Sequence, residues 1–407
     1  MDAPMKNSTW LYGALLCAVA VYCGGAAVGW SGLFGSVAGA QTSQPGGGLQ
    51  FTPVTLRIDQ PPVPVKGSDG RFHVVYEIEL TNFSGERAAI QEVSVLDARS
   101  GAVITSLDAA GIGERLVVRD RNAPRGTLGP SQAGILYLHI VFDSASAIPP
   151  MLAHRLSIAT GSKTIVATGS RIAMAAPASL MLEAPLRGSR YIAGDGCCDS
   201  VRHVRASLPV NGKIFLAQRF AIDWEQLDPQ GRIYVGDPKD PASYVIYGKP
   251  VYAVADARVA AAVDGLPDTP PGALPAGIPI GEADGNHVVL ELGNGRYALF
   301  AHLKPGSIRV RADDLVRAGD VLGQVGTSGN SSEPHLHFHV TDGPSALASN
   351  GLPYLLRTFT AARRGVSTAG FDQSILDGKP IPSEPMQRIG PRGGVLPLDL
   401  WIVDFPS

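Results

Sequence analysis

At 407 residues the chain is too long for one ordinary domain, and we expect two folded domains with tails. A formal net charge of −2 and a charged fraction of only 17% exclude the broad basic surface of a nucleic-acid-binding protein. The 48 glycines and 32 prolines follow no repeating period, which excludes collagen and favours a turn-rich, mostly β protein.

The amino terminus is predicted to be a targeting segment. Residues 7–56 contain no charged side chain, and the Ala-Gly-Ala sequence at residues 38–40 has the form of a signal-peptidase site. The apolar run at residues 10–37 is also long enough to span a bilayer. Residues 1–40 are therefore either a cleaved signal peptide or an uncleaved membrane anchor. Both alternatives place the rest of the chain outside the cytosol, in the cell envelope, the periplasm or the extracellular space.

Residues 41–50 (QTSQPGGGLQ) are predicted to be a linker, and residues 51–183 a β-sandwich of immunoglobulin-like type. Apolar and polar side chains alternate over residues 72–80, which is the period of a strand with one buried face. The histidines of this domain are isolated in the sequence, and we expect them to be ordinary surface or core residues: His73, His139 and His154.

A second β-rich domain is predicted over residues 184–364, followed by an extension at 365–407 whose apolar end packs as a strand. Its first feature is a hairpin with a strand from His203 to Val210, a turn at Asn211-Gly212 and a second strand from Lys213 to Trp224. The Pro- and Gly-rich loop at residues 264–282 is long enough to rim a groove.

Adjacent cysteines, Cys197 and Cys198, are the only two cysteines beyond the leader. We expect them to form a local oxidised turn. The alternative is metal ligation by the pair, although a Cys-rich zinc site would need further cysteines in this part of the chain.

The most informative stretch is PHLHFHV at residues 334–340, where three histidines alternate with strand-forming residues. In a strand their imidazoles project from one face, so neighbours two residues apart can share a metal site, whereas the outer pair cannot meet on one ion. A zinc hydrolase needs three protein ligands and an open position for water, with further groups that move a proton. His302, at the end of another predicted strand, and Asp223 are candidates to complete such a site.

Five segments resemble the lysostaphin/LytM-type zinc metallopeptidases, and the likeness covers roughly residues 200–345. The segments are GNHVVL (285–290), YALFAHL (297–303), GDVLGQVG (319–326), SGN (328–330) and PHLHF (334–338). The resemblance implies a β-rich domain of duplicated hybrid-motif type that cuts peptides of bacterial peptidoglycan. It also implies that His337 and Asp223 bind Zn²⁺, while His335 and His302 act on the water and on the tetrahedral intermediate.

The sequence departs from this family at Arg219, where the family has a zinc-binding histidine four residues before the aspartate. A guanidinium is cationic and offers no lone pair, so either no catalytic zinc binds or the third ligand lies elsewhere. We predict that it is His203. A three-residue hairpin loop would set His203 opposite Arg219 and on the face of Asp223, whereas a two-residue Asn211-Gly212 turn would send it to the other face.

Roles for the remaining polar residues are predicted as follows. His339 could replace the missing zinc ligand, but a role in supporting a ligand is favoured. His287 is predicted to be structural. Arg219 either holds a substrate carboxylate or an oxyanion, or it pairs with Asp199 or Glu225.

The expected function is that of an exported zinc metalloendopeptidase that acts on peptidoglycan peptides, with the sandwich as a positioning module or a binding module for an envelope protein. The alternative is a metal-free relative that uses the same groove to activate or position another cell-wall hydrolase. Membrane contact is expected only through an uncleaved leader, and no nucleic acid is expected as a partner.

Overall fold

The computed structural model describes residues 50–118, 122–272 and 274–407. The predicted leader and nearly all of the predicted linker, residues 1–49, lie outside the described residues, so export stays a prediction. Within the described part of the chain, no helix is long and apolar enough to cross a membrane.

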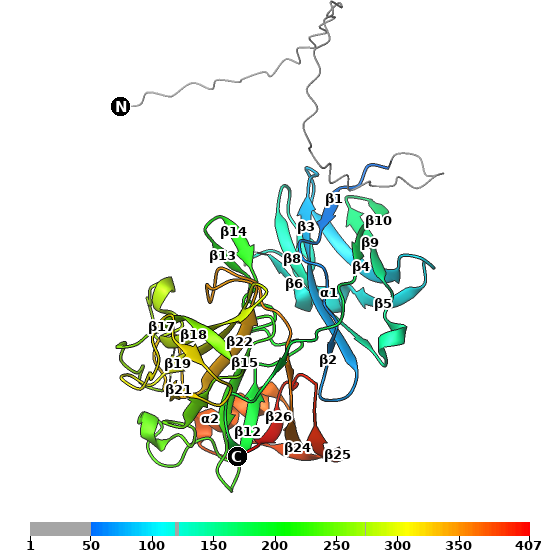
Figure 1. Cartoon of the computed structure of the whole chain (residues 1–407). Helices are drawn as coiled ribbons and strands as arrows, with labels where there is room; N and C mark the ends of the chain where they lie inside the picture. Colours follow the sequence, from blue (N-terminus) through cyan, green and yellow to red (C-terminus); the bar gives the residue numbers. More distant parts are fainter. Residues whose placement is uncertain (1–49, 119–121, 273) are drawn as a thin grey trace, which may run out of the picture. The chain divides into compact units, whose positions relative to one another are not determined.

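Strands make up most of the regular structure in the described residues, which confirms the predicted mostly β fold (Figure 1). Short apolar runs that end at glycine- or proline-containing turns favour strands over helices. The described helices are α1 (Ala109–Arg115), α2 (Thr368–Asp377) and three 3₁₀ turns at Ala145–Ala147, Pro241–Ser243 and Ile280–Glu282.

The first module contains two five-stranded sheets, one in the order β1-β3-β8-β6 and the other in the order β10-β9-β4-β5. In addition, β2 pairs with β3 and β7 pairs with β4. Fully buried residues of both sheets, such as Ile78 of β3 and Ile158 of β9, share one core. The immunoglobulin-like type of this arrangement stays a prediction. The strands are β1 (Val54–Arg57), β2 (Val65–Lys66), β3 (Phe72–Asn82), β4 (Ala88–Asp97), β5 (Val103–Asp108), β6 (Leu116–Val118), β7 (Thr127–Leu128), β8 (Ala133–Phe142), β9 (Met151–Thr160) and β10 (Lys163–Ala173).

The opposite face of β3 is buried against the second module. Val75 belongs to the hydrophobic core of that module. Beside it, the Arg219 guanidinium donates two hydrogen bonds to the Glu77 carboxylate, at 3.0 and 2.6 Å. The predicted ion pair of Arg219 with Asp199 or Glu225 is therefore wrong, because the side chain turns to the first module and its planar fork is taken by one carboxylate.

Replacement of Arg219 by alanine is expected to destabilise the protein by about 3–5 kcal/mol, because it leaves the Glu77 carboxylate buried without a partner. The two side chains are only 9% and 10% exposed. The measurement is the shift of the denaturant midpoint. Arg258→Ala removes ion pairs with Glu291 and Asp313 at the surface and serves as the control, for which little or no change is expected. A double variant with apolar side chains at both positions should recover much of the loss, and no recovery would contradict this account.

The histidines of the first module divide into two kinds. His154 is fully buried, with its Nε2 2.8 Å from the Tyr76 hydroxyl, which confirms a core role. His73 and His139, although isolated in the sequence, lie together in the structure, with ring centroids 5.2 Å apart. They lie on neighbouring strands, β3 and β8, and this pairing was not visible in the sequence.

The second module is built on a ten-stranded sheet in the order β20-β17-β18-β19-β22-β15-β12-β26-β24-β25. Its strands are β12 (Gly188–Gly194), β15 (Ile222–Gln226), β17 (Ala257–Val263), β18 (Asn286–Gly293), β19 (Arg296–Leu303), β20 (Leu315–Val316), β22 (Leu336–Thr341), β24 (Phe359–Gly365), β25 (Ser383–Arg392) and β26 (Trp401–Phe405). Three short pairs accompany it: β11 (Met181–Leu182) with β23 (Leu355–Leu356), β13 (Leu208–Val210) with β14 (Lys213–Phe215), and β16 (Pro250–Tyr252) with β21 (Val321–Gln324).

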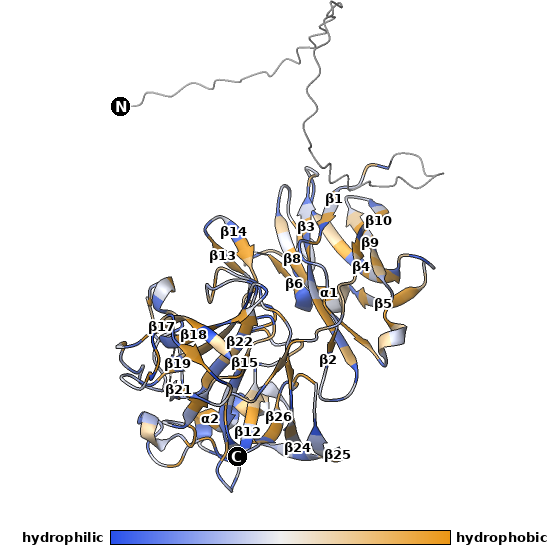
Figure 2. Ribbon diagram, viewed as in Figure 1, coloured by the Kyte–Doolittle hydropathy of each residue, from blue (hydrophilic) through white to orange (hydrophobic). Residues whose placement is uncertain are grey.

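The predicted extension, residues 365–407, is part of this sheet. Strand β26 lies between β12 and β24, and the predicted boundary at 364/365 falls within β24. The edge strand β25 is coloured largely as hydrophilic in Figure 2, and polar residues on an edge discourage pairing with another chain.

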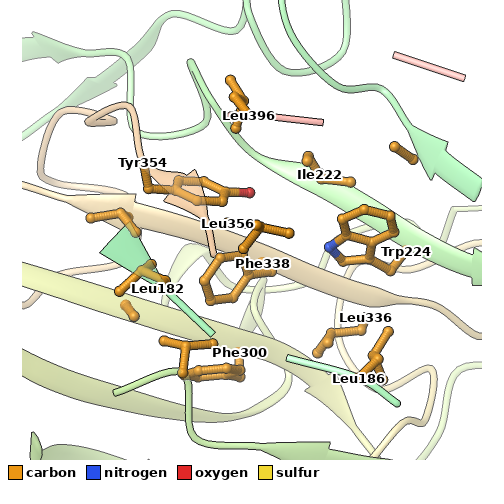
Figure 3. Close-up of a cluster of buried hydrophobic side chains, with 14 of the residues drawn as sticks. Leu182, Leu186, Ile222, Trp224, Phe300, Leu336, Phe338, Tyr354, Leu356 and Leu396 are labelled. Atoms are coloured by element: carbon orange, nitrogen blue, oxygen red, sulfur yellow. The ribbon is translucent and has the colours of Figure 1, made fainter. Parts of the chain in front are cut away.

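One face of the central strands carries the hydrophobic core. Ile222 and Trp224 of β15 and Leu336 and Phe338 of β22 are fully buried. Figure 3 shows these side chains gathered with those of neighbouring segments, including Phe300. Each of the two strands is thereby fixed in register, because a shift by one residue would turn its apolar residues away from the core.

Candidate metal centre

The polar site lies on the face of the sheet opposite this core. Asp223 of β15 and His337 of β22 are direct cross-strand partners. Each stands between two core residues, so the alternation of a strand turns both side chains to the other face. The Nδ1 of His337 lies 2.7 Å from the Asp223 Oδ1.

His203 reaches the same point by a route that the sequence analysis did not foresee. Val210 is opposite Lys213, so the hairpin has the two-residue Asn211-Gly212 turn, with positive φ at both residues, and not a three-residue loop. The predicted strand from His203 is wrong too, because β13 begins only at residue 208.

A turn that follows β12 carries the imidazole of His203 to Asp223. The backbone N–H of Arg205 donates to the carbonyl of Ser200 at 3.1 Å, which closes the turn around His203. Strand β12 is the neighbour of β15, with Gly194 opposite Asp223. The His203 Nε2 lies 3.3 Å from the Asp223 Oδ2.

His335 and His302 also lie beside His337. His335 directly precedes β22, and its Nε2 is 3.5 Å from the Asp223 Oδ1. His302, near the end of β19, has a left-handed backbone with φ of 60°, an uncommon conformation for a residue with a β-carbon. Its ring centroid lies 4.8 Å from that of His335 and 5.7 Å from that of His337.

The structure thus brings all five predicted site residues together. The potential ligand atoms of His203, Asp223 and His337 lie within 4.8 Å of one another, and so do those of His302, His335 and His337. Two imidazoles and one carboxylate are a donor set that suits Zn²⁺. The division into metal ligands and catalytic groups stays a prediction.

Each of the four histidines has one ring nitrogen held by an outer partner, and in three of them the other nitrogen lies 2.7 to 3.5 Å from the Asp223 carboxylate. Such a partner fixes the orientation and the tautomer of a metal-binding imidazole. The contacts are His203 Nδ1 to the Asp195 carbonyl (3.0 Å), His302 Nδ1 to the Ser328 carbonyl (2.8 Å), His335 Nδ1 to the Glu333 carbonyl (2.8 Å) and His337 Nε2 to His339 Nδ1 (2.8 Å).

Electrostatics in the site favour one ionised carboxylate among largely neutral imidazoles. Burial disfavours the charge of Asp223, but the adjacent histidines, His203 first, hold its pKa well below the usual value. Burial works against a charged His203 as well, yet Asp223 raises its pKa above the usual value. The pKa values of His302 and His337 are lowered, mainly by burial. An ionised carboxylate and neutral imidazoles are the forms that bind a metal ion.

The five residues line a cavity of about 720 Å³. The loop predicted to rim a groove contributes Pro271, Gly272 and Leu274 to its wall. Helix α2, which the sequence analysis missed, contributes Phe371 and Ile375. The extension therefore forms part of the groove and is not a separate tail.

Glu225 is a groove residue that the sequence analysis saw only as a partner for Arg219. It lies two residues after Asp223 in the same strand, and that spacing could have shown that both face the site. Burial, with Glu333 next in importance, raises its pKa well above the usual value, and its Oε2 has no hydrogen-bond partner. A neutral carboxylic acid at this place can donate a hydrogen bond to a bound peptide.

Two further histidines have positions that fit their predicted roles. His339 is completely buried and contacts His337 alone among the site residues, as a supporting group would. His287 is half-buried, with its Nδ1 2.8 Å from the Gly285 carbonyl, which is a structural contact.

Residues 244–348 match peptidase family M23. This stretch contains His302, His335 and His337. It begins after His203 and Asp223, so the part of the site in which the sequence departs from the resemblance lies outside the match.

Curated relatives match over a short segment. The DD-carboxypeptidase/endopeptidase Mpg of Neisseria meningitidis is 44% identical over 54 residues, which are 13% of this chain and 12% of that protein. The protein of the same name from Neisseria gonorrhoeae gives the same figures. The chain thus spans about an eighth of the length of these relatives.

Solved structures match the chain at low sequence identity and low TM-score. The catalytic domain of the prophage-encoded M23 protein EnpA from Enterococcus faecalis is 19% identical, with a TM-score of 0.23 and coverage of 42% of this chain and 92% of that one. The catalytic domain of lysostaphin from Staphylococcus simulans is 18% identical, with a TM-score of 0.22 and coverage of 40% of this chain and 88% of that one. A zinc-containing peptidase from Vibrio cholerae is 15% identical, with a TM-score of 0.25 and coverage of 74% of this chain and 86% of that one.

Proposed function

From the premise that residues 244–348 form a peptidase family M23 domain, we propose that this protein is an exported zinc metalloendopeptidase that hydrolyses peptide bonds in bacterial peptidoglycan. The single observation that carries the proposal is the convergence of Asp223 with His203 and His337 in a groove. It supplies three suitable ligands although the position of the usual histidine is occupied by Arg219.

The residues present fit a zinc ion. His203, Asp223 and His337 would hold it, and both imidazoles already have the outer partner that a metal-binding histidine requires. When bound, zinc lowers the pKa of a coordinated water and polarises a carbonyl group.

His302 and His335 are assigned to proton transfer. The Nδ1 of each lies near a backbone carbonyl, to which it donates, so the Nε2 carries the lone pair that can accept a proton. The pKa of His302 lies well below its usual value because of burial, which keeps this imidazole neutral. A neutral imidazole that gains a proton can then donate it to a developing oxyanion or a leaving amine.

Peptidoglycan as the substrate rests on the family and on the predicted export. Leu274 and helix α2 line the groove, and Glu225 and Glu333 add two carboxyl groups to its wall. The leader prediction places the chain where cell-wall peptides are found. The first module, joined by the Arg219–Glu77 pair, is proposed to position the groove or to bind an envelope protein.

The test is the zinc content of the full chain by elemental analysis, together with the amino groups that it releases from purified peptidoglycan. About one zinc per chain is expected, with activity that a chelator abolishes and added zinc restores. His337→Ala should lose both. His287→Ala, which removes a histidine of the same module outside the groove, should lose neither.

A chain without zinc after reconstitution would overturn the proposal. The metal-free alternative, a groove that positions or activates another hydrolase, would then take its place. Zinc without release of amino groups would leave the metal site standing and refute the substrate.

A further inference from the structure

A second group of metal-binding side chains lies outside the groove, where the first module meets the second. It consists of His73 on β3, His139 on β8 and Cys198, whose ligand atoms lie within 4.8 Å of one another. The Nδ1 of His73 is 3.0 Å from the Nε2 of His139. Val75 pairs with His139, so the two histidines are diagonal neighbours on one face of the sheet.

The imidazole of His73 is held in the orientation that a metal ligand needs. Its Nε2 lies 3.1 Å from the Asp69 Oδ1, which leaves Nδ1 to face His139 and Cys198. A carboxylate behind a histidine is the common outer partner in metal sites. Gly67 lies against the same edge of the ring as Asp69, because a β-carbon there would stand 2.8 Å from the Cδ2 and Nε2 of His73.

The group has access to solvent through a cavity. Asp69, His73, His139 and Cys198 line a space of about 740 Å³, whose opposite wall comes from β25 and the start of β26. His73 and Cys198 are buried, at 4% and 7% exposed, and His139 is half-buried.

Cys198 is joined to Cys197 in a vicinal disulfide, as predicted. The thiolate, and not a disulfide sulfur, is the strong ligand for a metal ion. We propose that His73, His139 and Cys198 form a second metal site, which takes a thiophilic divalent ion such as Zn²⁺ once the Cys197–Cys198 disulfide has been reduced. Imidazole and thiolate donors together suit zinc. This site uses none of the groove residues, so it does not rest on the proposed function.

The change of state is a thiol–disulfide exchange. A dithiol reductant attacks the disulfide, is itself oxidised to a disulfide by loss of two electrons and two protons, and leaves two thiols at Cys197 and Cys198. On metal binding, the sulfur–hydrogen bond of Cys198 breaks, its proton goes to solvent, and a bond from sulfur to metal forms.

The experiment uses Co²⁺ as the probe on the full chain, because a thiolate bound to Co²⁺ gives a charge-transfer band that the groove, which contains no cysteine, cannot give. Cys197→Ser leaves Cys198 as a free thiol and should show the band without any reductant. The wild type should show it only after treatment with a dithiol and anaerobic desalting. Cys198→Ser keeps the leader cysteines and should show no band, either before or after treatment with the dithiol.

Histidine variants separate this site from binding by thiols alone. His139→Ala should weaken Co²⁺ binding by more than the about 10-fold to 100-fold loss expected for the outer-partner variant Asp69→Asn. The proposal is overturned if the reduced wild type, with its thiols verified by titration, shows no band. An unchanged band in His139→Ala would overturn it as well, since the cysteines would then bind without the histidines.

Discussion

Asp223→Asn is expected to abolish zinc binding and peptidase activity together. Asp223 lies within 3.5 Å of ring nitrogens of His203, His335 and His337, so this carboxylate is in direct contact with three of the four histidines. An amide keeps the shape of this side chain and removes the charge. The loss of zinc affinity should exceed the about 10-fold to 100-fold effect of removing an outer partner.

Isothermal titration with Zn²⁺ measures the affinity, and release of amino groups from peptidoglycan measures the activity. The matched control is Asp228→Asn, which removes a carboxylate that accepts hydrogen bonds from Arg232 in the same module but lies outside the groove. Its zinc affinity should be unchanged. Asp223→Asn with zinc affinity equal to that of the wild type would refute the assignment of Asp223 as a ligand.

The same substitution changes the histidines around it. Without the carboxylate, the effect of burial on His203 is no longer opposed by its nearest anion, so the pKa of His203 should fall below that in the wild type. Titration of the His203 imidazole in the metal-free protein by NMR reports this change directly. A pKa that stays raised would show that another group holds the charge.

How much of this site the sequence could predict depends on the range of the interactions involved. Alternation in PHLHFHV places His337 and His339 on one face of a strand, and the structure has that strand as β22. The pairing of Asp223 with His337 joins residues 114 positions apart. Nothing local encodes such a pairing, and the resemblance to a family supplied it.

The prediction of His203 is the opposite case. His203 lies beside Asp223 as predicted, but the local structure that was expected to bring it there is wrong. Asn211-Gly212 is the strongest signal for a two-residue hairpin turn, and the chain follows it. His203 nevertheless lies beside Asp223, because it belongs to a turn after β12 and not to the hairpin. A residue in a turn is not bound by strand alternation, so no register argument could place it.

The burial of the polar face of β3 could not be predicted from the sequence. In β3 the residues His73, Val75 and Glu77 alternate with the core residues and suggest a solvent-facing side. That side packs on the second module, where Glu77 meets Arg219 and Val75 enters the core. Contact between modules depends on the complementary shape and charge of two surfaces. The sequence of one strand does not show which surface it will meet.

His203→Ala is expected to lower zinc affinity and activity almost as far as loss of His337, because two protein ligands do not hold zinc in the tetrahedral arrangement that three provide. The metal-free protein should remain folded. His203 is anchored by the Asp195 carbonyl at 3.0 Å, and its removal leaves no charged group without a partner, since His335 and His337 still neighbour Asp223. Near-ultraviolet circular dichroism checks the fold, and elemental analysis checks the zinc.

The decisive comparison adds Arg219→His to His203→Ala. If residue 219 faced the metal site and lacked only the histidine that the family has there, the second substitution would restore zinc. The Arg219 side chain instead points to Glu77 of the first module and is held there by two hydrogen bonds. A histidine at this position is therefore expected to face the module junction, and the double variant should stay free of zinc. Recovery of zinc in the double variant would show that Arg219 occupies the true ligand position, and zinc retained by His203→Ala alone would remove His203 from the site.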